Sequence, residues 1–137
     1  MSKLWIYNTN SPYGEELHGG VHYFKVVVKE GKHDFIIDAI RDREEKEAKK
    51  FNQEVVSSLR QLKDGDWLLR LRVKYFRSRC MVKMDYRDKT EQYLKTYDEL
   101  TSSDELDVQI TLGDGFIFNW NGESRVGLNI YLDKVVV

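Results

Sequence analysis

After Gly65 the chain alternates between apolar and polar positions, which is the pattern of a half-buried β-strand. One face of this strand is apolar and consists of Trp67, Leu69, Leu71, Val73 and Tyr75. The other face is mostly basic and consists of Leu68, Arg70, Arg72, Lys74 and Phe76. "FRSR" (76–79) breaks the alternation, as a turn or bulge would, and "CMVKM" (80–84) resumes it. The pattern therefore predicts a basic two-stranded ribbon.

The clearest helical pattern covers residues 41–65. Asp42 is placed to cap the first turn, with Glu45 three residues later as in a capping box, and Gly65 is placed to end the helix. The charged run at 43–50 is most simply interpreted as the solvent-exposed face of this helix. Apolar residues recur at helical spacing and form one stripe, which consists of Ala48, Phe51, Val55, Leu59 and Leu62.

Most of the remaining chain predicts short strands joined by tight turns. The β-branched run at 20–28, a turn at 30–33 and a returning strand at 34–40 together predict an N-terminal β-hairpin. Asn121-Gly122 separates two alternating runs and predicts a second hairpin, whereas 88–100 has the spacing of a short helix. These elements indicate an α+β protein of mostly antiparallel strands, most economically a small barrel with one long amphipathic helix.

Length and composition suit one domain over residues 1–137. A single Cys excludes an internal disulfide, and no apolar run of about 18 residues is present to span a membrane. The N-terminus is too polar for a signal peptide. We therefore expect a cytoplasmic protein with no membrane partner.

Motifs for catalysis are weak. His18 and His22 are four residues apart but flank Gly19-Gly20, so a helix that presents both to one metal is not expected. Cys80 lies on the apolar face of its strand, as a small core residue would. No Gly-rich phosphate loop or Ser nucleophile elbow is present. We expect no enzyme, no catalytic residue, no metal site and no cofactor.

Charge is unevenly distributed along a chain whose formal net charge is only −1. Residues 60–89 contain ten Lys and Arg against four acids, and residues 90–137 contain nine acids against three bases. Nucleic acid needs cations along a groove, and single-stranded bases need aromatic faces on which to stack. The candidates for phosphate contacts are Arg70, Arg72, Lys74, Arg77, Arg79 and Lys83. The candidates for stacking are Phe76, Tyr86 and Trp120.

Two structural alternatives compete with this interpretation. The cations could be neutralised by the acidic C-terminal third, in particular by Asp104, Glu105 and Asp107. Phe116, Phe118 and Trp120 share one strand face, and an all-aromatic strand face more often belongs to a core than to a binding surface.

"LKDGDWLLRLRVKYF" (62–76) looks like the entry to the first strand of an oligonucleotide/oligosaccharide-binding (OB) barrel. "GDGFIFNWNGESRVGLNIYLDKVVV" (113–137) resembles the closing hairpin of small phage-encoded single-stranded DNA-binding proteins. The resemblance covers about residues 62–137 and implies an OB-like barrel whose basic and aromatic face holds a single strand. It further implies a viral protein of DNA replication in the host cytoplasm. The chain departs from that family by ending in "KVVV" instead of an acidic tail, and by its extra residues 1–63.

Three hypotheses follow. The first is a non-enzymatic protein that binds single-stranded DNA or RNA with little sequence preference. The second is a protein-interaction module or inhibitor, of the phage or mobile-element type, that docks on a protein partner. The third is a homo-oligomer that pairs through open strand edges at the N-terminal strand and at "KVVV".

Overall fold

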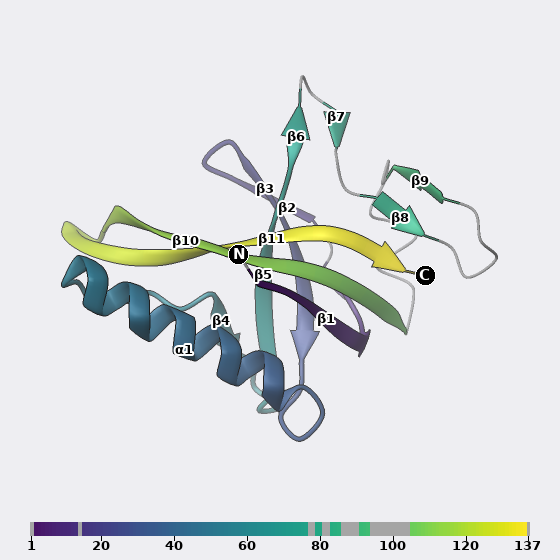
Figure 1. The fold of residues 1–137 in the computed structure, drawn as a ribbon, viewed down its shortest axis with the longest axis horizontal. Coiled ribbons are helices and arrows are strands. Elements are labelled where there is room, and N and C mark those ends of the chain that lie inside the picture. Colours follow the sequence, from purple (N-terminus) through teal and green to yellow (C-terminus); the bar gives the residue numbers. More distant parts are fainter. Residues whose placement is uncertain are drawn as a thin grey trace.

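The computed structural model describes residues 2–13, 15–76, 79–80, 83–85, 91–93 and 105–136, with the backbone alone described in 75–93. The described elements are one helix and a set of strands (Figure 1). In chain order these are β1 (Ser2–Thr9), β2 (Glu15–His18), β3 (Val21–Val28), α1 (Asp34–Phe51), β4 (Leu59–Gln61), β5 (Trp67–Val73), β6 (Tyr75–Phe76), β7 (Arg79–Cys80), β8 (Lys83–Asp85), β9 (Glu91–Tyr93), β10 (Leu106–Trp120) and β11 (Glu123–Val136).

The main sheet has the strand order β1-β10-β11-β5-β3-β2 and is mostly antiparallel. Parallel pairing occurs where β11 meets β5 and β8. In Figure 1, β1, β10 and β11 run across the view while β3 and β5 run down it. Strands from both groups and the first half of α1 bury apolar side chains in one core, which includes Ile6, Phe24, Leu71, Ile110, Leu132 and Ile40.

The described strands do not close into a barrel through a continuous ladder. The segment that follows β1 nevertheless returns to β3, where the Val27 N–H donates to the Asn10 carbonyl at 2.9 Å. The hydroxyls of Thr9 and Ser11 donate to carbonyls of β3 beside it. The predicted α+β, OB-like class is therefore confirmed. Between residues 9–11 and β3, these few hydrogen bonds take the place of a regular strand pairing.

The predicted helix boundaries and the predicted N-terminal hairpin are wrong. Residues 34–40 form the first turns of α1, because Ile36, Ile37 and Ile40 recur at helical spacing and face the core. The burial of this isoleucine-rich face overrides the strand preference of β-branched residues. The helix ends at Asn52, whose left-handed conformation (φ 52°) serves as the C-cap. The hairpin that forms instead is β2–β3, with a turn at Gly19-Gly20.

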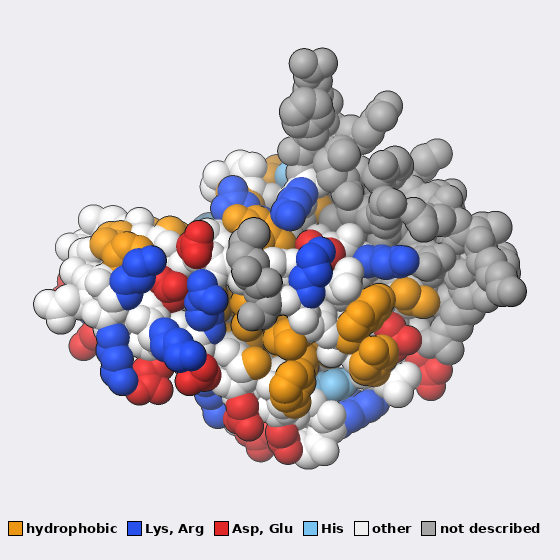
Figure 2. Space-filling model, in the orientation of Figure 1, with side chains coloured by type: hydrophobic (Ala, Val, Ile, Leu, Met, Phe, Trp, Pro, Cys, Tyr) orange, Lys and Arg blue, Asp and Glu red, His pale blue; other side chains and the backbone are white. Residues whose placement is uncertain are grey.

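The charged run of α1 is only partly a solvent-exposed face. Lys46 pairs with Asp42 and Lys49 with Glu45 on the exposed side, at 3.1 and 3.2 Å. Figure 2 accordingly shows acidic and basic side chains intermingled over α1. Glu44 and Glu47, however, are only 3% and 5% exposed. These two carboxylates continue the buried face that the isoleucines begin, and the interpretation of the run as wholly solvated is wrong for them.

Pairing after β5 also departs from expectation. Within the described residues, the two strands of the ribbon are β6 and β7, which pair over two residues each. Strand β8 pairs instead with the end of β11. Residues 91–93 form strand β9, so the helix predicted over 88–100 is wrong there, and its other residues lie outside the described set. The Asn121-Gly122 hairpin is confirmed as the connection between β10 and β11.

Candidate nucleic-acid interface

Strand β5 presents a basic face outward, as its sequence alternation predicts. Leu69 and Leu71 are fully buried in the core, whereas Arg70 is exposed and Arg72 half-buried on the opposite face. Antiparallel pairing with β3 sets Tyr23 directly opposite Arg72. The two arginines therefore lie next to an aromatic side chain of the neighbouring strand.

Each of the two arginines is oriented by a neutral neighbour. The Arg70 guanidinium carbon lies 4.1 Å from the ring centroid of Tyr23, within the range of a cation–π contact. The Arg72 Nη1 donates to Asn129 Oδ1 at 3.3 Å. Within the described part of the chain, neither guanidinium forms an ion pair. As far as the described residues show, most of the five N–H donors of each side chain have no protein partner and can bind an anionic ligand.

The aromatic face of β10 lies on the surface. Phe116 and Trp120 are 40% and 47% exposed, and the rings of Phe116 and Phe118 are 5.6 Å apart. The rings cover Gly127 on β11, where an added Cβ would lie 2.8 Å from Phe116 Cζ and 3.3 Å from Phe118 Cε1. The absence of a side chain at Gly127 thus lets the rings lie against the backbone. The alternative that this strand face belongs to the core is wrong.

These two features meet in one pocket of about 330 Å³. Its described lining comes from β2, β3, β5, β10, β11 and the segment before β4, and neither Asp nor Glu is among these residues. A concave surface with cations, aromatic rings and no carboxylate suits an anionic ligand that has planar groups. The side chains that define this character are Tyr23, Arg70, Arg72, Phe116, Phe118 and Trp120, and we call this surface the basic-aromatic pocket.

A buried carboxylate of α1 holds one wall of the pocket. Glu44 accepts hydrogen bonds from the Ser57 hydroxyl at 2.8 Å and from the Ser58 N–H at 2.9 Å. Both serines line the pocket. Burial raises the pKa of Glu44 above its ordinary value, although the two hydrogen bonds oppose this shift by favouring the carboxylate.

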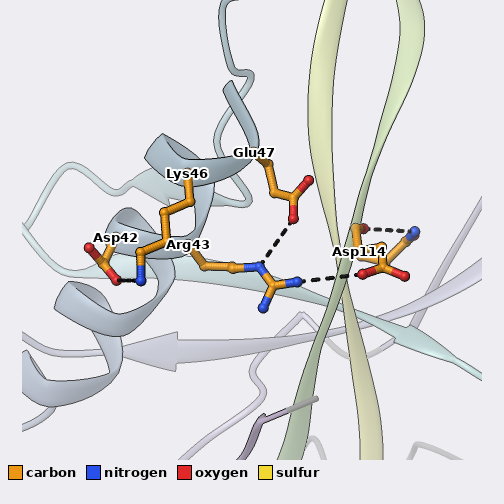
Figure 3. Close-up of polar contacts among 6 residues, drawn as sticks. Asp42, Arg43, Lys46, Glu47 and Asp114 are labelled. Atoms are coloured by element: carbon orange, nitrogen blue, oxygen red, sulfur yellow. Dashed lines mark hydrogen bonds and ion pairs between the residues drawn. The ribbon is translucent and has the colours of Figure 1, made fainter. Parts of the chain in front are cut away.

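The β10–β11 hairpin is tied to the same helix at the base of its aromatic segment (Figure 3). Arg43 contacts Glu47 Oε1 at 3.3 Å and Asp114 Oδ1 at 3.5 Å. The Asn129 amide donates to the Asp114 carbonyl at 3.2 Å. Glu47 packs against Gly115, where an added Cβ would lie 2.7 Å from its Oε2. Helix α1 therefore fixes both the serine wall and the hairpin that carries the aromatic rings.

No family model and no curated protein sequence matches this chain. Among solved structures, the single-stranded DNA-binding protein from bacteriophage Enc34 in complex with ssDNA is similar, with a TM-score of 0.60 and 14% identity over 98% of this chain and 83% of that one. A C-terminal truncation of the same phage protein gives a TM-score of 0.57 at 15% identity, with the same coverage. The resemblance to phage single-stranded DNA-binding proteins is therefore confirmed for the fold. Because the similarity covers 98% of this chain, it includes the N-terminal half as well as residues 62–137.

The structure brings together three of the predicted site residues, because Arg70, Arg72 and Trp120 all line the basic-aromatic pocket. Lys74 lies beside it, in an adjoining hollow that Arg72 also lines. The remaining predicted residues stay predictions. Phe76, Arg79 and Lys83 lie on β6, β7 and β8 with only their backbone described, and Arg77 and Tyr86 lie outside the described residues.

Neutralisation of the cations by the acidic C-terminal third is limited in the described part of the chain. Lys74 lies 3.9 Å from Asp133, an acid outside the predicted set. Asp107 accepts a hydrogen bond from the Asn8 N–H at the other end of β10, and Asp104 lies outside the described residues. Among the described residues, the two pocket arginines therefore have no ion-pair partner, whereas Lys74 lies near one carboxylate.

Sequence reasoning missed several pocket residues. Tyr23 was not among the candidates, although the burial alternation of Phe24, Val26 and Val28 could have placed it on the outer face of β3. Asn129 gave no signal, because its role depends on a neighbour 57 positions away in the sequence. Among the described residues, no group of three or more His, Cys, Asp or Glu could hold a metal ion. The one described helix does not combine the length and the apolar character needed to cross a membrane.

Proposed function

We propose that this protein binds single-stranded nucleic acid without catalysis, and that the basic-aromatic pocket is its binding site. The observation that carries the proposal is the meeting of Arg70 and Arg72 with the β10 aromatic rings in one pocket whose described lining includes no carboxylate. The fold similarity to a phage protein solved in complex with ssDNA supports the same conclusion.

The chemistry of the pocket favours a single strand over a duplex. The arginines can pair with phosphates, and the exposed rings of Phe116 and Trp120 can stack on bases. A duplex keeps its base faces inside its own stack, so only its phosphates would be available. Because every base has a π-face, binding should depend little on sequence. In this proposal Lys74 contacts a phosphate next to the pocket, and Phe76, Arg77, Arg79, Lys83 and Tyr86 extend the contact surface beyond it.

The direct test is fluorescence anisotropy with labelled oligo(dT) of about 30 nucleotides, long enough for any site of this class. The titration is run at low and at near-physiological salt, with a duplex of the same length and with oligo(rU) in parallel. We expect binding that prefers the single strand and weakens as salt rises, because phosphate contacts release counterions. The affinities for oligo(dT) and oligo(rU) show whether the protein prefers DNA or RNA.

The absence of binding to either single strand at low salt would overturn the proposal. The pocket would then be a surface for a protein partner, as the second hypothesis holds. Salt-independent binding would retain a nucleic-acid ligand but contradict the assignment of the arginines to phosphate.

A further inference from the structure

A chain of contacts leads from the basic-aromatic pocket across β11 to the far edge of the sheet. Lys74, next to Arg72 in the adjoining hollow, lies 4.8 Å from the ring centroid of Tyr131 and 3.9 Å from Asp133. Lys3 on β1 approaches the other oxygen of the same carboxylate at 3.7 Å. Asp133, whose side chain is largely buried, thus lies between two exposed ammonium groups.

The outward face of β1 continues this surface with aromatic rings. Ile6 points into the core, so Trp5 and Tyr7, on either side of it, point outward together with Lys3. The Trp5 and Tyr7 rings are stacked, with centroids 5.8 Å apart and planes 10° from parallel. Tyr7 is 56% exposed, and Figure 2 shows hydrophobic side chains gathered along β1. A preformed aromatic stack on the surface beside a lysine has the chemistry of a base-stacking platform.

We propose that Lys3, Trp5 and Tyr7 form a second subsite for single-stranded nucleic acid, occupied by the same strand that binds in the basic-aromatic pocket. The inference rests on the proposed function. The strand leaves the pocket at Arg72, crosses β11 over Lys74 and Tyr131, then crosses β10, and reaches β1, where Lys3 contacts a phosphate. A base then stacks on the exposed Tyr7 ring and lengthens the Trp5–Tyr7 column.

Charge favours a nucleic-acid strand over a second copy of this chain as the occupant. Among the described residues, the path contains cations on β5 and β1 and two carboxylates. Both lysines already contact Asp133, and Asp107 accepts a hydrogen bond from the Asn8 N–H beside Tyr7. An apolar interface between copies would gain nothing from lysines at its centre, whereas a polyanion is attracted to each of them. The pocket and the path share Arg72, which lines both the basic-aromatic pocket and the adjoining hollow that contains Lys74. Asp133 then connects Lys74 with Lys3 on β1.

The length of the oligonucleotide separates this inference from the proposed function. A short oligo(dT) of about 6 nucleotides can fill the pocket alone, whereas one of about 20 nucleotides can reach both subsites, given typical sites of about 4 to 16 nucleotides for such a fold. We expect Trp5→Leu/Tyr7→Leu to weaken binding of the long oligonucleotide about tenfold, the effect of removing one stacked base, and to leave the short one unchanged. The matched control is Phe51→Leu, which also replaces a partly exposed aromatic side chain. Phe51 is the last residue of α1, whereas the start of the helix is the end that lies near β1 (Figure 1).

Each outcome decides a separate point. Equal affinities of the double variant and the wild type for the long oligonucleotide would overturn the second subsite and leave the pocket intact. Failure of the wild type to bind either length would remove the proposed function and the inference with it. If thermal unfolding shows the double variant to be misfolded, Tyr7→Leu alone serves, since its ring is mostly exposed. Lys3→Gln then tests the phosphate contact through a smaller salt dependence for the long oligonucleotide only.

Discussion

The guanidinium of Arg70 lies over the ring of Tyr23 at 4.1 Å, across the boundary between β5 and β3. This contact positions the guanidinium through a neutral ring and not through an ion pair with a carboxylate. It also leaves the ring and the guanidinium in the same wall of the basic-aromatic pocket. In a structural ion pair, by contrast, a carboxylate would already offset the charge of the arginine.

Removal of both pocket arginines should change the salt dependence of binding. For Arg70→Gln/Arg72→Gln we expect weaker binding and a slope of log K against log salt that is smaller by about 1.4, or about 0.7 for each phosphate of a single strand that is no longer neutralised. Anisotropy titrations across a salt series measure this slope. Lys46→Gln/Lys49→Gln, which removes two paired cations from the exposed face of α1, should leave it unchanged. An unchanged slope in the arginine variant would contradict phosphate binding by these residues.

Trp120 near the hairpin tip should contribute a stacked base. Trp120→Ala should weaken binding to oligo(dT) by about 1–3 kcal/mol, the usual range for removal of one base–aromatic stack. Ile117→Ala is the control, because Ile117 is 52% exposed on the opposite face of the same strand. Equal losses of affinity in the two variants would show that the hairpin acts through its stability and not through one face.

Gly127 should be intolerant of a side chain because of the rings above it. In Gly127→Ala the new methyl would meet Phe116 at 2.8 Å, so the ring must move. We expect a decrease of about 1–3 kcal/mol in the free energy of unfolding, as is typical of overpacking, together with weaker binding. Chemical denaturation measures the first effect. The second variant Gly127→Ala/Phe116→Leu should recover part of the stability, and failure to recover any would place the strain elsewhere.

Glu44 should make the stability of the protein depend on pH in a particular direction. Its pKa is raised in the folded protein above the ordinary value of 4.5, mainly because burial penalises the charged form. The folded state therefore binds the proton more tightly than the unfolded state, and this group lowers the free energy of unfolding as pH rises from about 4.5 through the folded pKa. Glu44→Gln removes the titration.

The measurement is the difference in unfolding free energy between wild type and Glu44→Gln, taken from urea curves between about pH 4 and pH 7. We expect the wild type to lose stability relative to the variant as pH rises. Comparison with the variant is needed because Glu16 shifts in the opposite direction, its pKa being lowered by a hydrogen bond from Lys25. A difference that grows in favour of the wild type with rising pH would contradict the account of Glu44.

Local patterns predicted some elements well. The alternation of β5 determined which face carries Arg70 and Arg72, because successive side chains of a strand point to opposite sides whatever the fold. The Asn121-Gly122 turn was equally predictable, since both positions require positive φ and these residues tolerate it. The helix boundaries could not be predicted in the same way. Glu44 and Glu47 interrupt the apolar stripe of α1, and the isoleucines before them favour a strand.

A basic strand, a tight aromatic hairpin and a mostly antiparallel, OB-like class could all be predicted from the amino-acid sequence. It could not decide whether Phe116, Phe118 and Trp120 face the core or the solvent, because both faces of that strand carry apolar residues. Tertiary structure decided this by extending the hairpin past the core and placing its aromatic face beside Arg70 and Arg72. The physical reason is that strand alternation is a local property, whereas the assembly of a pocket depends on which distant strands pair and on the helix that supports them.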